Sequence, residues 1–74
     1  MTDSYDTIGK RATQGIKDNS KQKGRSIALE CALLGINETS LREWKKGECN
    51  PSAYFLQQMA LAGYDVMWIL TGKR

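Results

Sequence analysis

The side chains best suited to hydrogen bonding with another molecule gather between residues 37 and 46. Glu38, Thr39 and Arg42 stand three and four positions apart, the spacing that puts side chains on one face of a helix. In the major groove of DNA, arginine can bind O6 and N7 of guanine, threonine can contact the thymine methyl, and a carboxylate can accept from cytosine N4. The spacing therefore predicts that these three residues read base edges of double-stranded DNA.

Two of these residues also have a simpler interpretation. Glu38 and Arg42 stand four positions apart and can form an exposed ion pair, worth about 0.2–0.5 kcal/mol on a helix. An acidic residue in a first helical turn is stabilising by itself, because the helix dipole is positive there. A base contact by Glu38 therefore remains one of two open alternatives, and Glu43 is given none because phosphates would repel it.

Basic residues form two clusters along the chain. Residues 10–25 carry six lysine and arginine side chains opposed only by Asp18, and Arg42, Lys45 and Lys46 follow later, within a formal net charge of +3. Two such clusters can form one electropositive face in the folded chain, although a solvated lysine-rich surface has the same composition. We expect phosphate contacts from Lys21, Lys23, Arg25, Asn37, Lys45, Lys46 and Asn50.

Helices must position these side chains, and the first is predicted at the start of the chain. Apolar residues at helical spacing follow Ser4 and Asp6, either of which can cap a helix that ends at about Asn19. Gly9 and Gly15 weaken this prediction, because a glycine within a helix costs about 1 kcal/mol relative to alanine. A polar connection follows the first helix. We expect Lys21, Lys23 and Arg25 to approach DNA from the start of the second helix.

Four further helices are expected from caps, glycines and good helix formers. They are predicted over residues 26–34 with Ser26 as cap, 37–46 with Asn37 as cap, 51–62 opened by Pro51 or Ser52, and 65–72 with Asp65 as cap. No strand is convincing, and there is no repeat or linker within the chain. The sequence therefore predicts one all-α domain of five helices over residues 1–74.

Residues 27–47 have the pattern of two short helices that meet at a tight turn. Such a turn favours a residue that can adopt positive φ, which Gly35 provides. Cys31, four positions earlier, is the small residue that close packing of the two helices requires. The apolar contacts that hold the pair are assigned to Leu34, Ile36, Leu41 and Trp44. The opposite face of the second helix is then free to enter the major groove.

This segment resembles the helix-turn-helix of lambda-repressor-like domains, the Xre and Cro-type family of phage and bacterial regulators. Residues 37–47 look like the family's recognition helix with its Trp and closing Gly, and Asn50-Pro51-Ser52 resembles the entry to its fourth helix. Residues 65–72 are similar to the family's Trp-Leu-Leu-Thr-Gly ending. The likeness covers about residues 5–74 and implies a compact five-helix fold with the helix-turn-helix at helices 2 and 3.

One position departs from the family's pattern. The residue before Cys31 is usually apolar in the family, and here it is Glu30. We therefore expect Ala28 or Leu29 to replace it in the core, with the second helix rotated or beginning at a different residue.

Composition excludes several classes of protein. The chain is 74 residues long and 41% hydrophobic, which is too apolar for a disordered segment. No apolar run approaches the roughly 20 residues of a membrane span, and the polar, acidic residues 1–6 are unlike a signal peptide. We expect a cytoplasmic protein that is associated with the nucleoid when bound to DNA.

Catalytic chemistry is not expected. The chain has no histidine, which removes the commonest general base, and its two cysteines are too few for a zinc site. Cys31 and Cys49 are expected to be free thiols, since the chain is not expected to be secreted. The sequence predicts no enzymatic activity, no metal, no cofactor and no small-molecule ligand.

The last predicted helix is apolar on almost every side. One side must complete the core, and the rest suggests burial against a second copy of the chain. We expect a homodimer with Trp68 in the core and with Tyr64 and Met67 near the partner, which would place two recognition helices about 34 Å apart on a near-palindromic operator. Dimerisation could instead belong to a further domain that continues from residues 71–74.

The resemblance implies a sequence-specific DNA-binding protein that regulates transcription, most simply a phage- or prophage-type repressor. The alternative is a protein-interaction adaptor on the same fold, such as an antirepressor or an antitoxin-like module, because fold alone does not determine function. An adaptor has no need of a basic face that includes Arg42, Lys45 and Lys46, which favours the DNA-binding interpretation.

Overall fold

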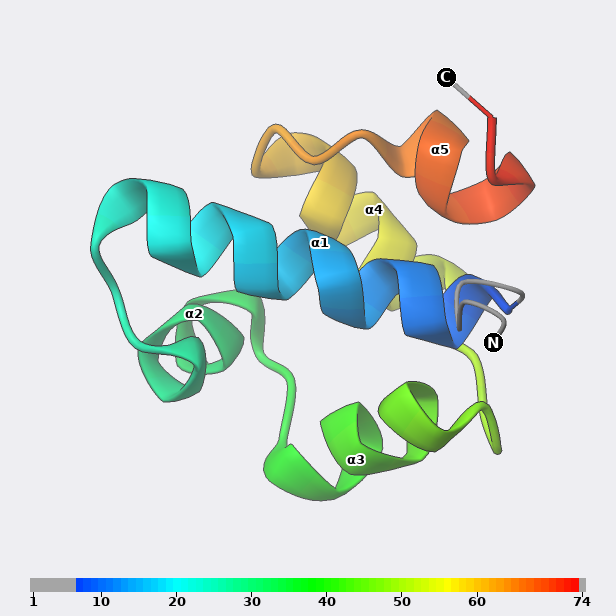
Figure 1. The fold of residues 1–74 in the computed structure, drawn as a ribbon, viewed down its shortest axis with the longest axis horizontal. Coiled ribbons are helices and arrows are strands. Elements are labelled where there is room, and N and C mark those ends of the chain that lie inside the picture. The colour runs from blue at the N-terminus through cyan, green and yellow to red at the C-terminus, as the bar shows by residue number, and fades with distance from the viewer. Residues whose placement is uncertain (1–6, 74) are drawn as a thin grey trace, which may run out of the picture.

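The computed structural model describes residues 7–73, and this part of the chain forms five α-helices and no strand. The helices are α1 (Ile8–Lys23), α2 (Ile27–Leu34), α3 (Glu38–Lys46), α4 (Ala53–Leu61) and α5 (Val66–Thr71), as labelled in Figure 1. The all-α class and the number of helices agree with the prediction from sequence. Ser4 and Asp6, proposed as caps of the first helix, lie outside the described residues.

The first helix has different ends from those predicted. Thr7 caps α1 by accepting a hydrogen bond from the backbone N–H of Lys10, and the helix continues past Asn19 to Lys23. The expected polar connection is thus the last turn of a helix, because the Ser20 hydroxyl donates to the Lys17 carbonyl and Asn19 bonds to groups on other elements. Lys21 and Lys23 therefore belong to the end of α1 rather than to the start of α2.

The helix pair α2 and α3 has the predicted caps and turn. The Ser26 hydroxyl accepts from the N–H of Leu29, and the Asn37 side chain accepts from the N–H of Ser40 at 2.8 Å. Between the helices, Gly35 has a φ of 76°, and the N–H of Ile36 donates to the Cys31 carbonyl. The turn therefore uses a conformation that favours glycine, as expected.

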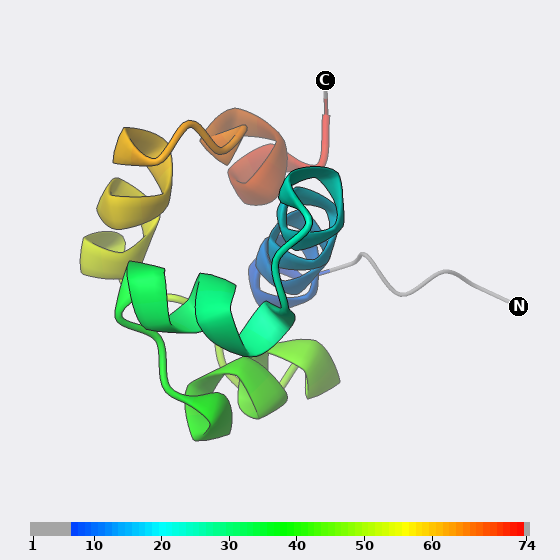
Figure 2. The same cartoon turned by 90° about the vertical axis from the view of Figure 1, so that its left-hand side faces the viewer.

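The helices surround one core. α1 packs against α2, α3 and α5, while α4 packs against α2 and α5 (Figures 1 and 2). The fully buried centre combines Ile16 of α1, Met59 of α4 and Ile69 of α5. Around it lie the other buried apolar residues, Ala12, Cys31, Leu34, Ile36 and Trp44. α3 and α5 lie on opposite sides of α1, below and above it in Figure 1.

The beginning of α1 approaches the end of α3 very closely at Gly9. A Cβ atom on Gly9 would lie 2.5 Å from the Cys49 carbonyl oxygen and 3.0 Å from the Trp44 Cα atom. The backbone N–H of Gly9 donates to Asn50 Oδ1 at 2.9 Å. The glycine that weakened the helix prediction is thus the residue that allows α1 and the end of α3 to pack together.

The last two helices follow the sequence prediction closely. α4 follows Pro51 and Ser52 and ends at Leu61, one residue before the predicted end. The Asp65 carboxylate caps α5 by accepting from the N–H of Trp68, and Gly72 ends it. Arg11 of α1 donates from Nε to the Ile69 carbonyl at 2.8 Å and so fixes the end of α5. None of the described helices combines the length and hydropathy needed to cross a membrane.

Candidate nucleic-acid interface

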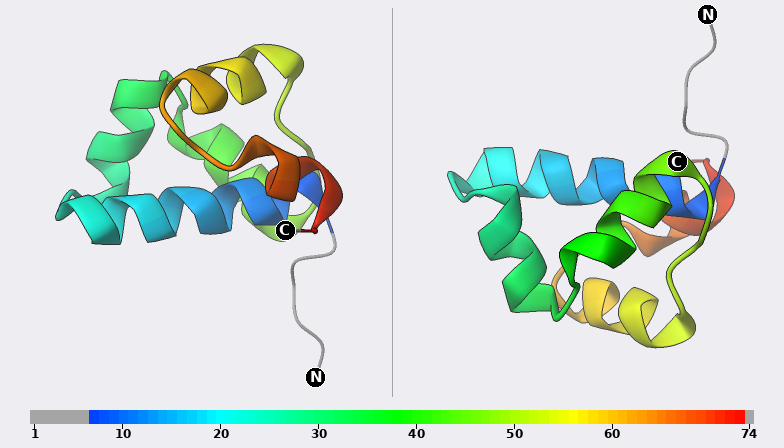
Figure 3. Two further views of the ribbon diagram at one scale, coloured as in Figure 1. Left: turned by 90° about the horizontal axis from the view of Figure 1, so that it is seen from above. Right: turned by 90° about the horizontal axis from the view of Figure 1, so that it is seen from below.

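One side of α3 is anchored in the protein and the other is open to solvent. Trp44 is buried and its ring meets Phe55 edge-on, with centroids 5.6 Å apart, while Leu41 packs against the core from a half-buried position. Seen from below in Figure 3, α3 lies in front of α1 and no described helix covers its outer side. Five of the polar residues singled out on this helix are exposed: Glu38, Thr39, Arg42, Lys45 and Lys46.

The two ends of α3 have opposite character. At the N-terminal end, Asn37 is exposed and its side-chain oxygen caps the helix. The remaining backbone N–H groups of the first turn are directed outward. At the C-terminal end, Lys45 and Lys46 lie in the last turn, where positive charge also balances the helix dipole. Each end of α3 therefore offers its own kind of anion contact, backbone N–H groups at the start and lysine ammonium groups at the end.

Asn50 has a structural role that the sequence did not predict. Its Oδ1 accepts the N–H of Gly9 at the start of α1, although the residue itself is exposed. The bond ties the turn after α3 to the beginning of α1. A contact from Asn50 to a phosphate would therefore have to use the amide Nδ2 atom.

A basic residue missed by the sequence analysis lies beside the end of α3. A Cβ atom on Gly47 would lie 3.0 Å from Cε of Lys10, so the lysine stem of α1 runs next to the closing glycine of α3. Lys10 was counted in the first basic cluster but not chosen as a contact residue. The signal that could have found it is its neighbour Gly9, whose close packing brings α1 to this end of α3.

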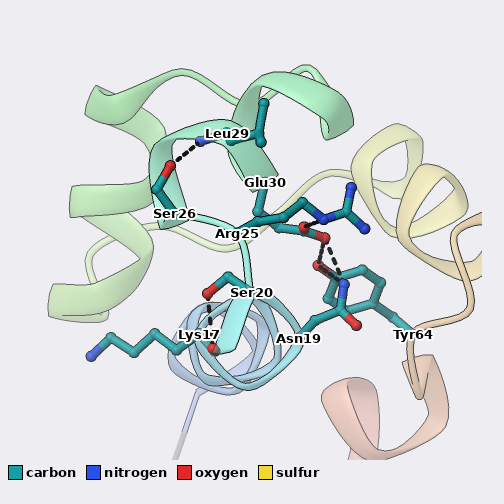
Figure 4. Close-up of polar contacts among 8 residues, drawn as sticks. All are labelled: Lys17, Asn19, Ser20, Arg25, Ser26, Leu29, Glu30 and Tyr64. Carbon is teal, nitrogen blue, oxygen red and sulfur yellow. Dashed lines mark hydrogen bonds and ion pairs between the residues drawn. The ribbon is translucent and has the colours of Figure 1, made fainter. Parts of the chain in front are cut away.

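The three remaining basic candidates do not lie together on α3. Lys21 and Lys23 are exposed in the last turn of α1. Arg25 follows in the connection to α2, and its Nε atom lies 3.4 Å from Oε1 of Glu30, with 30% of the arginine side chain exposed. Figure 4 shows this guanidinium beside the Glu30 carboxylate, so the charge of Arg25 is partly balanced by a buried carboxylate.

Glu30 is buried, and the sequence prediction for its position was wrong. It is 3% exposed and occupies the buried position, whereas both residues expected to replace it there, Ala28 and Leu29, are exposed. Glu30 Oε2 accepts from the Tyr64 hydroxyl at 2.5 Å and from Asn19 Nδ2 at 2.6 Å (Figure 4). The helix is not rotated, because hydrogen bonds from α1 and from the turn before α5 compensate for the buried charge.

These contacts control the ionisation of Glu30. Burial raises the pKa of the carboxyl, but the hydrogen bonds from Tyr64 and Asn19 and the charges of Arg25 and Lys23 outweigh burial and hold the pKa below its ordinary value. For Tyr64, burial and the bond to Glu30 raise the pKa of the phenol. The pair is therefore a phenol donating to a carboxylate at neutral pH.

The residues expected at a dimer contact differ in exposure. Met67 is 67% exposed on α5. Tyr64 is half-buried, with its hydroxyl bonded to Glu30 within the same chain. Trp68, expected in the core, is half-buried and packs against the core's edge. Leu61 and Leu70 add further exposed apolar area on α4 and α5.

Both cysteines are free, as predicted: Cys31 is buried and Cys49 is exposed in the turn after α3. Loss of hydration and neighbouring carboxylates raise the pKa of both thiols, so neither is an activated nucleophile at neutral pH. Within residues 7–73, no group of three or more cysteine, aspartate or glutamate side chains is placed to hold a metal ion.

The chain matches no family model, no curated protein and no solved structure.

Proposed function

We propose that the chain is a sequence-specific DNA-binding protein of the lambda-repressor-like helix-turn-helix type, in which α3 enters the major groove. The observation that carries the proposal is the division of α3 into a buried anchor, Trp44, and an exposed face that bears Thr39, Arg42 and Lys46. A helix that is held by the core on one side and left uncovered on the other can reach into a groove about 12 Å wide. In this account the protein represses transcription by occupying an operator, as a phage- or prophage-type regulator does.

Base reading is assigned to the exposed face of α3. Arg42 in mid-helix is the proposed guanine reader, and Thr39 near the start is placed to touch a thymine methyl or a phosphate. Glu38 is a candidate acceptor for the N4 amino group of cytosine. Its alternative roles are to stabilise the helix dipole in the first turn and to form an ion pair with Arg42. A good arginine–guanine pair is worth about 1–3 kcal/mol of discrimination against the wrong base.

Phosphate contacts are assigned to groups at both ends of α3. At the N-terminal end of α3, the phosphate contacts are assigned to Asn37 and the N–H groups of the first turn. At the C-terminal end, they are assigned to Lys45, Lys46 and Asn50. Lys21, Lys23 and Arg25 are kept as weaker candidates, since they lie at the end of α1 and Arg25 is paired with Glu30. Such contacts fix the orientation of the protein and add salt-dependent affinity.

The proposed active species is a homodimer. Met67 and Leu70 on α5 and Leu61 at the end of α4 are exposed apolar residues, and exposed apolar area that forms one patch favours burial against a partner. Two recognition helices related by a two-fold axis would read half-sites one helical turn apart. Tyr64 is also proposed to lie near this contact. Its ring would approach the partner, because its hydroxyl donates to Glu30.

A second candidate function is a protein-interaction adaptor on the same fold. Its support is the outer side of α2, where Leu29 and Leu33 are 47% and 60% exposed and no charged side chain is exposed. An adaptor would bind through such an apolar surface and would tolerate the loss of Arg42. DNA binding is preferred because the polar side of α3 has no use in the adaptor account.

Selection of bound sequences from a random duplex library tests the proposal, followed by fluorescence anisotropy titration of the enriched duplex and a scrambled control at two salt concentrations. We expect a near-palindromic sequence bound about a thousandfold tighter than the control. Equal and steeply salt-dependent binding of both duplexes would indicate phosphate attraction alone and would favour the adaptor.

A further inference from the structure

A hollow lies between α1 and α5, away from α3. Its volume is about 150 Å³, and it is walled by the second half of α1, the turn before α5 and the first turns of α5. Gly15 and Gly63 contribute no side chain to the wall, which leaves the space open. This space exceeds what a single water molecule needs, about 10–15 Å³ on the same measure, and the hollow is open to solvent on one side. It can therefore accept a small ligand or the end of a longer one.

The chemistry of the walls is that of a site for a positive charge. The side chains among the described lining residues that are charged at neutral pH are two carboxylates, Asp18 from α1 and Asp65 from the turn before α5. They face the hollow in a chain whose net charge is +3. Trp68 and Tyr64 supply aromatic rings to the same wall. Carboxylates with aromatic rings attract an organic cation through both charge and the ring quadrupole.

Amide side chains complete the polar part of the wall. Asn19 and Gln22 line the hollow from α1, and each carries a carbonyl oxygen able to accept from an ammonium or a guanidinium group. The buried Ile69 forms an apolar patch against which a short alkyl chain can lie. The walls thus combine negative charge, neutral acceptors and apolar contact in one small space.

We propose that this hollow is a binding site for a small organic cation, an alkylammonium or alkylguanidinium group on a short apolar chain. The charge lies between Asp18 and Asp65, and the alkyl part contacts Trp68 and Ile69. The hollow is separate from the proposed DNA-contacting face, because α3 lies on the other side of α1 from α5 (Figure 1).

The site is connected to α2 through two of its wall residues. Asn19 and Tyr64 both line the hollow, and both hold the carboxylate of Glu30 within α2. A ligand that shifts either side chain also shifts a partner of Glu30. Ligand binding in the hollow therefore changes the surroundings of Glu30 in α2, the helix that precedes the turn to α3.

Three probes of similar size and different charge test the site: n-butylamine, 1-butanol and butyrate, each titrated at neutral pH against the full chain labelled with ¹⁵N. The backbone amides and the Trp68 indole N–H report binding by their chemical shifts. We expect saturable, millimolar binding of butylammonium, with shifts at Asn19, Gln22, Gly63 and Trp68 that extend to the Glu30 amide. Butanol should bind at least threefold more weakly, and butyrate should not bind.

Neutral variants of matched shape separate charge from shape. Asp18→Asn keeps an oxygen that can accept from Gln14, and Asp65→Asn keeps a residue able to cap α5. Each should weaken butylammonium binding at least threefold, while Glu48→Gln, which removes an exposed carboxylate elsewhere, should leave it unchanged. Equal binding of butanol and butylammonium, or unchanged binding in both aspartate variants, would overturn the cation site. An unmoved Glu30 amide at saturation would overturn the connection to α2.

Discussion

Glu30 joins three parts of the molecule through one carboxylate. It lies on α2 and accepts hydrogen bonds from Asn19 of α1 and from Tyr64 in the turn before α5, while Arg25 approaches its other oxygen. That second oxygen accepts no hydrogen bond within the described residues. The carboxylate is therefore held by hydrogen bonds on one side and by an ion pair on the other, and it fixes α2 relative to α1 and α5.

Removal of the carboxylate should destabilise the fold. Glu30→Ala leaves the Tyr64 hydroxyl, the Asn19 amide and the Arg25 charge without their partner, and we expect a loss of about 3 kcal/mol in the free energy of unfolding. Tyr64→Phe removes the bond that the hydroxyl donates to Glu30 and the longer one that it accepts from Asn19, and it should cost about 1.5 kcal/mol. Urea unfolding measures both values. A loss below about 0.5 kcal/mol for Glu30→Ala would show that this contact does not hold the helices together.

Stability should also depend on pH through Glu30. The pKa of its carboxyl is lower in the folded chain than the ordinary value of 4.5, so the folded state binds fewer protons than the unfolded state. The stabilisation is complete above pH 4.5 and is lost as the pH falls through the lower, folded pKa. We expect Glu30→Gln to lose less stability than the natural chain between pH 5 and pH 3, measured by thermal unfolding. Parallel losses in both proteins would contradict this assignment.

At the scale of elements, the packing of α1 against α3 depends on Gly9. Gly9→Ala would place Cβ 2.5 Å from the Cys49 carbonyl oxygen, so two backbone segments must separate. We expect a loss of about 2 kcal/mol in the free energy of unfolding, because strain from overpacking exceeds the gain in helix propensity. Unfolding in urea measures the change.

Gly15 provides the matched control on the same helix. A Cβ atom there would meet its nearest neighbour, Cδ2 of Tyr64, at 3.5 Å, an ordinary van der Waals distance. Gly15→Ala should therefore raise the free energy of unfolding by up to about 1 kcal/mol. Equal effects of the two substitutions would refute the close approach of α1 and α3 at Gly9.

Element positions were largely predictable from local signals, and the exception has a tertiary cause. The caps at Ser26, Asn37 and Asp65 each precede a helix in the structure, because capping depends on neighbours within three residues. The end of α1 was not predictable in this way. Asn19 and Ser20 have the composition of a turn, and Asn19 is held in the helix by contacts with Glu30 and Tyr64, which come from distant parts of the sequence.

The candidate site shows the same division. The exposure of Thr39 and Arg42 opposite Trp44 follows from helical periodicity, which is a local property. The pairing of Arg25 with Glu30 does not follow from helical periodicity. It depends on a charged residue at a buried position where an apolar residue was expected. The contact of Lys10 with the end of α3 likewise required the close approach at Gly9.

At the scale of the whole molecule, self-association is the property that the proposed function requires. Met67→Glu puts a charge into the expected contact on α5, and we predict at least a tenfold weaker dimer by sedimentation equilibrium. Leu33→Glu changes a similarly exposed apolar residue on α2 and should leave the dimer intact. If Leu33→Glu weakened the dimer more than Met67→Glu did, the interface would lie on α2 rather than on α5. If the natural chain were monomeric, dimerisation would belong to another part of a longer protein.

The central claim is that α3 reads DNA sequence, and Arg42→Ala tests it most directly. Anisotropy titrations compare this variant with the natural chain on a selected duplex and on a scrambled one, with Lys73→Ala as a control that removes one positive charge beyond α5. Loss of a base contact should weaken binding to the selected duplex about 10- to 100-fold and binding to the scrambled duplex far less. Lys73→Ala should have little effect on either duplex. Equal losses on both duplexes, or no loss on the selected one, would contradict base reading by α3.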